Sequence, residues 1–151
     1  MALTTQAFEI PGVLLSVEAG AAHTAFQFCL VSVDSAGEAA LPAATGQAVD
    51  GVIQDGAADG YAENIMVTGV SKCVAGTGGV TRGDLIKAEI TTGRGITVAA
   101  NRSIVNTSDG GSATDPVIGS YVIGNALTTA AAGELFALLL THAGLVQTTN
   151  A

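Results

Sequence analysis

The side chains that could do chemistry are few in this chain and lie far apart along it. The 151 residues include two histidines, His23 and His142, and two cysteines, Cys29 and Cys73. An enzyme site needs a nucleophile, base or ligand set brought together at a recognisable spacing. No carboxylate or cysteine stands at metal-ligand spacing from either histidine, and Ser71 lacks the Gly-x-Ser-x-Gly frame of a hydrolase nucleophile. The sequence therefore predicts no catalytic residue, no metal site and no cofactor.

Two glycine-containing patterns fit turns better than binding loops. Asp-Gly pairs recur at Asp50, Asp55 and Asp59, but these spacings do not match the alternating ligands of a calcium loop. Residues 76–81 read Gly-Thr-Gly-Gly-Val-Thr, which fails the Gly-x-Gly-x-x-Gly pattern and has no phosphate-binding lysine. Both patterns therefore predict tight turns between strands.

Charge and hydropathy restrict the class of partner. The chain carries 13 acidic and five basic side chains, a formal net charge of −8. Nucleic-acid binding depends on Lys and Arg neutralising phosphates, so we expect no nucleic-acid partner. No apolar run reaches the roughly 18 residues of a membrane-spanning helix, so we expect no membrane partner either. Residues 1–9 lack the basic start and apolar core of a secretory signal, which predicts synthesis in the cytoplasm. Cys29 and Cys73 are predicted to be buried free thiols, although their spacing alone leaves a disulfide open.

The elements that would position these residues are short strands. The pattern predicts strands at 26–31, at 49–53, and at 65–74 with a glycine kink, a hairpin of 85–90 with 96–99, and closing strands at 117–123 and 135–140, with a polar loop at 101–116. The Ala-rich and Leu-rich run over 130–140 also suits a helix, but Gly133 and the short apolar run favour a strand. Short strands separated by turn signals predict an all-β, single-domain β-sandwich or β-barrel-like fold.

The N-terminal residues 1–24 differ from this pattern and are predicted to form an extended arm. They precede a β-rich domain at 25–147 and a short tail at 148–151. The apolar residues of the arm lie on both sides of a Pro-Gly break and do not alternate cleanly with polar ones. We therefore expect a partner surface or a neighbouring subunit to cover them. These predicted contact residues are Phe8, Ile10, Pro11, Leu14 and Leu15. In the alternative interpretation, the arm pairs with its own domain as an edge strand.

Three groups of segments together resemble a family of small tailed-bacteriophage virion proteins, the capsid decoration or cement proteins. Their shared patterns are apolar residues and glycines in a fixed order from about residue 26 to residue 146. The segments are 51–54, then 66–72 with 80–86, then 118–127 with 130–140. Members of the family vary in their N-terminal parts, so the resemblance does not extend to residues 1–24.

The resemblance implies a non-catalytic structural virion protein with a β-rich fold. It implies a homotrimer on the outer surface of an icosahedral head, where it would bind the major capsid protein and cement neighbouring capsid subunits. The alternative is a tail-associated or fibre-associated β-module with a carbohydrate-binding or protein-binding role. An enzyme that uses His23 or His142 is the third interpretation.

Overall fold

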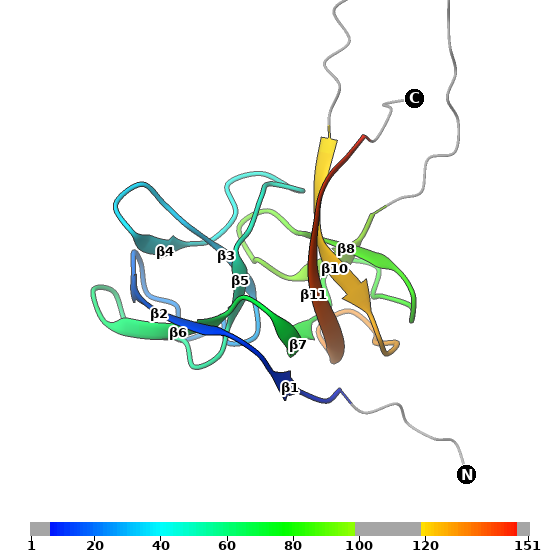
Figure 1. Ribbon diagram of the computed structural model, residues 1–151, viewed down its shortest axis with the longest axis horizontal. Helices are drawn as coiled ribbons and strands as arrows, with labels where there is room; N and C mark the ends of the chain where they lie inside the picture. The colour runs from blue at the N-terminus through cyan, green and yellow to red at the C-terminus, as the bar shows by residue number, and fades with distance from the viewer. Residues whose placement is uncertain (1–6, 99–118, 148–151) are drawn as a thin grey trace, which may run out of the picture.

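The computed structural model describes residues 7–98 and 119–147, and every element in these ranges is a strand (Figure 1). The prediction of an all-β, barrel-like fold is confirmed. The strands form two units, a six-stranded antiparallel sheet and a five-stranded closed barrel. No helix in the described ranges is long and apolar enough to cross a membrane.

The barrel is built from the first half of the chain. Its strands, in order around the barrel, are β2 (Leu14–Ala19), β4 (Glu38–Ala40), β3 (Leu30–Val33), β5 (Gly51–Ile53) and β6 (Ala62–Met66). Strand β2 closes it, because β2 pairs with β6 on one side and with β4 on the other. Its small core contains Val31, Ala39, Ile53 and Ile65, all fully buried. Alternation of such residues with exposed ones is what a small closed barrel requires.

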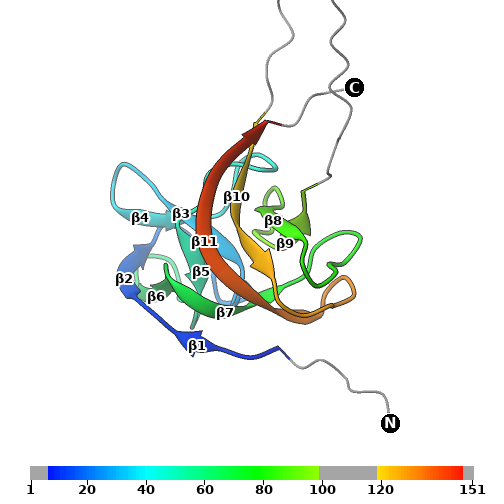
Figure 2. The ribbon, with the colours of Figure 1, turned by 45° about the vertical axis from the view of Figure 1, so that its right-hand side comes forward.

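The six-stranded sheet curves beside the barrel, as Figure 2 shows. Its order is β1 (Ile10–Pro11), β7 (Gly69–Val74), β11 (Leu135–Gln147), β10 (Gly119–Ala126), β8 (Leu85–Ala88) and β9 (Gly95–Thr97). Phe136 is the largest fully buried side chain and packs with Ile86, Ile123 and Leu138 in the main core. This core continues into the barrel through Leu30 and Val52, so the two units share one apolar interior.

The two units are joined where β6 ends and β7 begins. The sequence pattern predicted one kinked strand over 65–74, but residues 67 and 68 separate two strands that belong to different sheets. Gly69 has a φ of 99°, and a Cβ there would lie 2.6 Å from the carbonyl oxygen of Ile10. The glycine therefore serves a crossover between sheets and a close approach of β1, rather than a bulge within one strand.

The other strand predictions are largely confirmed. Strands β8 and β9 form the predicted hairpin, and β10 and β11 are the predicted closing strands, so the helical alternative for 130–140 is wrong. The predicted strand at 26–31 begins only at Leu30, because Phe28 adopts a left-handed φ of 63° within a turn. The predicted loop at 101–116 and the tail at 148–151 lie outside the described residues.

The predicted arm is part of the fold over residues 10–19. Strand β1 pairs with β7 at the edge of the six-stranded sheet, as the edge-strand alternative predicted, whereas β2 pairs with both β4 and β6 and is not an edge strand. Sequence alternation did not reveal β2 because its first residues are apolar and exposed at the same time. The division at residue 24 is therefore not a boundary between separate parts of the structure.

Candidate functional site: an exposed N-terminal strip

Large apolar side chains are exposed along the N-terminal stretch of the fold. Five of the nine large hydrophobic residues that the described structure exposes lie between residues 8 and 15. We call these five the N-terminal strip: Phe8, Ile10, Val13, Leu14 and Leu15, with exposures from 42% to 59%. Exposed apolar residues gathered in this way are typical of an interaction surface. The five contact residues predicted from the sequence are all exposed. Four of them belong to the strip, which contains Val13 where the prediction has Pro11.

Backbone pairing holds the strip in place on the body of the protein. Ile10 lies opposite Val70, and Leu15 lies opposite Ile65. Between the two strands, the Val13 N–H donates to Thr68 Oγ1 at 2.8 Å, and its carbonyl accepts from the Val67 N–H at 2.9 Å. The strip is therefore formed before any partner binds, which reduces the ordering cost of association.

One ion pair stands at the beginning of the strip. Lys72 Nζ lies 3.9 Å from Glu9 Oε2 and 5.6 Å from the centre of the Phe28 ring. These contacts connect the residue between Phe8 and Ile10 to β7. A partly exposed pair of this kind contributes little to stability, so it is a weak link between the strip and β7.

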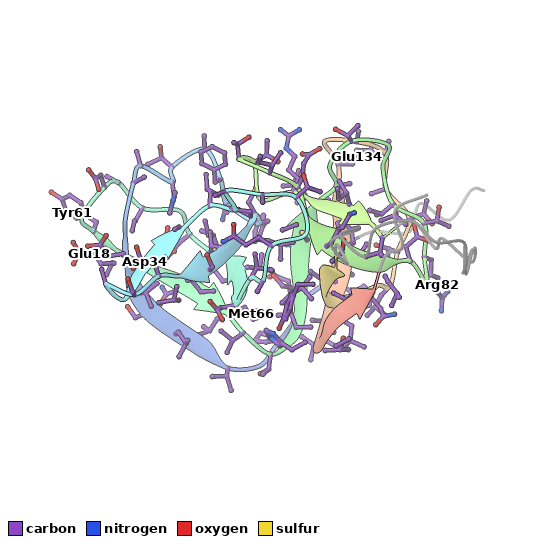
Figure 3. All side chains as sticks on the ribbon, turned by 90° about the horizontal axis from the view of Figure 1, so that it is seen from above. Glu18, Asp34, Tyr61, Met66, Arg82 and Glu134 are labelled. Carbon is purple, nitrogen blue, oxygen red and sulfur yellow. The ribbon has the colours of Figure 1, made fainter. Side chains whose placement is uncertain are left out.

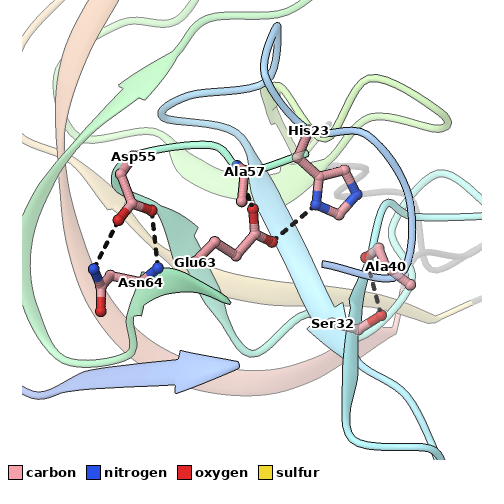
Figure 4. A network of polar contacts seen from close by, with 7 residues as sticks. All are labelled: His23, Ser32, Ala40, Asp55, Ala57, Glu63 and Asn64. Carbon is pink, nitrogen blue, oxygen red and sulfur yellow. Dashed lines mark hydrogen bonds and ion pairs between the residues drawn. The ribbon is translucent and has the colours of Figure 1, made fainter. Parts of the chain in front are cut away.

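The first histidine belongs to a buried polar pair that the sequence did not suggest (Figure 4). His23 Nδ1 and Glu63 Oε1 share a hydrogen bond of 2.8 Å, and both side chains are almost completely buried. The Ala57 N–H donates to the second carboxylate oxygen at 3.2 Å. The partners are 40 residues apart and meet only because of the barrel topology. The pair has no access to a substrate and serves the structure of the barrel.

The second histidine lies at the surface and bridges the two units. His142 Nδ1 is 3.1 Å from the Tyr121 hydroxyl, and its Nε2 is 2.6 Å from the carbonyl oxygen of Val67. Burial raises the pKa of Tyr121, and the nearby carboxylate of Asp50 raises it further. Because both ring nitrogens are engaged, this histidine ties β11 to the crossover that leads into β7.

The two cysteines are buried free thiols, as predicted, and do not form a disulfide in this structure. Burial raises the pKa of the Cys29 thiol to about 11. Burial also raises the pKa of Cys73, and the proximity of Cys29 adds to this effect. A thiol whose pKa is raised in this way holds its proton at neutral pH and is a poor nucleophile or metal ligand.

The remaining candidates serve turns and local structure. Gly56 and Gly60 have φ values of 58° and 76°, as turns require. Asp55 caps a loop by accepting from the N–H and the side-chain amide of Asn64, at 2.9 and 2.7 Å. The Ser71 hydroxyl is buried and donates to a backbone carbonyl. Within residues 7–98 and 119–147, no three His, Cys, Asp or Glu side chains are grouped so that they could hold a metal ion.

The comparisons with known proteins concern the fold. No protein-family model and no curated protein matches the chain. A solved structure described as the head fiber gp8.5 N base in bacteriophage phi29 matches with a TM-score of 0.55 and 19% sequence identity. The match covers 89% of this chain and 98% of that chain. The chain thus has, over most of its length, a fold that is also used by the base of a bacteriophage head fibre.

Proposed function

We propose that the protein is a structural component of a bacteriophage particle that binds the outer surface of the head. The observation that carries this proposal is the fold match, because it covers nearly the whole of a head-fibre base. The N-terminal strip supports it, since a protein that coats a shell needs a preformed apolar surface to bind there. The proposal includes the absence of catalysis and of any cofactor.

In the first version of this proposal, the protein decorates the shell and cements it. It would bind the major capsid protein as a homotrimer, with Phe8, Ile10, Pro11, Leu14 and Leu15 in the contact. Burial of apolar area contributes roughly 25 cal/mol per Å² before the costs of association, so one modest contact is weak. Repetition over symmetric sites would convert that modest contact into resistance of the whole shell to internal pressure.

In the second version, the protein is the base on which a fibre stands. The description of the phi29 protein as a head-fibre base favours this version. The two versions share the attachment to the head and differ in mechanical consequence. A cement stabilises the shell, whereas a fibre base carries another segment outward and leaves shell stability unchanged.

Heating of purified particles separates the two versions. Particles that lack the protein should release their genome at a lower temperature than complete particles if the protein is a cement. Equal release temperatures, together with occupancy of the head, would favour the fibre base. Absence of the protein from the purified particles would contradict both.

A further inference from the structure

The charged side chains of this protein are divided unequally between its two units. No Lys or Arg occurs from residue 12 to residue 71, a range that contains the whole barrel. The carboxylates in that range are Glu18, Asp34, Glu38, Asp50, Asp55, Asp59 and Glu63, of which only Glu63 is buried. Figure 3 shows Glu18 and Asp34 at one end of the molecule and Arg82 at the other. The barrel is therefore an acidic unit without its own cations.

This acidic unit is continuous with the N-terminal strip, because β2 contributes to both. Glu18 lies on the same face of β2 as Leu14, four residues and about 13 Å further along the strand. On the neighbouring strand β4, Glu38 lies directly opposite Glu18 in the parallel register. Like charges placed side by side in this way repel each other. The described residues provide no ion pair to either carboxylate, so a cation from a partner would relieve this repulsion.

A second copy of the chain is a poor fit for this face. If this face packed against the same face of another copy, two barrels without Lys or Arg would meet with like charge, and each copy carries a formal net charge of −8. A surface that combines an apolar groove with neighbouring Lys or Arg side chains would meet the strip with apolar contact and the end of β2 with opposite charge. Electrostatic complementarity of this kind accelerates association and selects the partner.

We propose that the N-terminal strip and the adjoining carboxylates of Glu18 and Glu38 form one composite docking face for a different protein, whose surface has an apolar groove bordered by Lys or Arg. This inference rests on the proposed function, in which that protein belongs to the shell. Apolar contact with the strip slows dissociation of the complex, whereas the carboxylates increase the association rate and orient the two proteins as they approach.

The experiment measures binding of the purified full chain to shells that were assembled without it. The apolar half is tested by Leu14→Ser/Leu15→Ser, and its matched control is Ile90→Ser/Leu135→Ser, at two similarly exposed residues outside the strip. Because the two leucines are about half exposed, we expect the strip variant to bind about 30-fold more weakly, mainly through faster dissociation. The control should bind like the wild type, and thermal melting of both variants identifies any loss of folding.

The charged half is tested by Glu18→Gln, with Glu134→Gln as its control at an exposed carboxylate outside the barrel. We expect Glu18→Gln to slow association about threefold at low salt and to melt slightly higher, because the repulsion from Glu38 is removed. Wild-type binding should weaken as salt rises from about 50 mM to about 500 mM, since screening opposes attraction between unlike charges.

Three results would overturn the inference. Binding that salt strengthens, or that Glu18→Gln leaves unchanged, would exclude a basic partner surface. A strip variant that binds like its control would exclude the strip. Self-association of the wild type that the strip variant abolishes, with shell binding intact, would assign the strip to a second copy. In all three cases the wild type still binds the shell, so the proposed function is retained and only this inference is rejected. A wild type that does not bind the shell would contradict both the proposed function and this inference.

Discussion

Removal of the Glu63 carboxylate should destabilise the protein more than the loss of any exposed carboxylate. The Glu63 side chain is completely buried and satisfies two groups, His23 Nδ1 and the Ala57 N–H. His23 Nε2 has no hydrogen-bond partner among the described residues, so Glu63→Ala leaves both ring nitrogens without a partner there. Each buried polar group left unsatisfied costs about 1–3 kcal/mol, which gives a total of about 4 kcal/mol for the two. In a domain of this size that loss lowers Tm by about 12 °C.

Urea unfolding with linear extrapolation measures this loss directly. Glu63→Gln keeps an acceptor for the Ala57 N–H and should lose about half as much stability. Glu18→Ala removes an exposed carboxylate from the neighbouring strand β2 and should stay within about 0.5 kcal/mol of the wild type. A loss below about 1 kcal/mol in Glu63→Ala, or an equal loss in Glu18→Ala, would refute the assignment of a buried, stabilising pair.

Three further perturbations test other parts of the structure. Gly69→Ala and Gly78→Ala both place a side chain at a positive φ, but only the Cβ at Gly69 would clash with backbone atoms. We therefore expect Gly69→Ala to lose about 2 kcal/mol more folding stability than Gly78→Ala and to expose residues 8–15 to proteolysis. Equal losses of stability would contradict the crossover geometry. Because burial raises the pKa of Cys29 to about 11, the folded thiol holds its proton above the pH of about 8.5 at which the unfolded thiol loses it, and stability should fall as pH rises through this window. Cys29→Ala should flatten that slope in urea unfolding between these pH values, and an unchanged slope would contradict the buried position of the thiol. His142→Asn and Tyr121→Phe should each cost about 1 kcal/mol and together cost less than the sum, because they share one hydrogen bond; additive losses would show that the bond does not form.

Local sequence patterns predicted the second half of the fold well. The hairpin of β8 and β9 follows from two apolar runs on either side of a glycine-containing turn, and β11 follows from a six-residue apolar run after Gly133. In these places the side-chain pattern and the turn residues both favoured a strand. Agreement between these local signals made the prediction reliable.

The first half of the fold depends on contacts between residues far apart in the sequence, which a local sequence pattern does not reveal. The sequence predicted one strand with a kink at Gly69, whereas the chain passes from the barrel into the second sheet there. Strand β2 has exposed apolar residues where alternation would require polar ones, so its pairing with β6 was not evident. The His23–Glu63 pair spans 40 residues and forms only when the barrel closes. Most residues of the apolar strip could be identified from the sequence, because they are apolar but do not follow a pattern that would place them in a core.

Electron microscopy of purified particles, with and without this protein, tests the central claim most directly. We expect additional density of matching size on the outside of the head, at the junctions between neighbouring shell subunits, with the N-terminal strip turned toward the shell. Density confined to the tail, or particles that are identical with and without the protein, would contradict it.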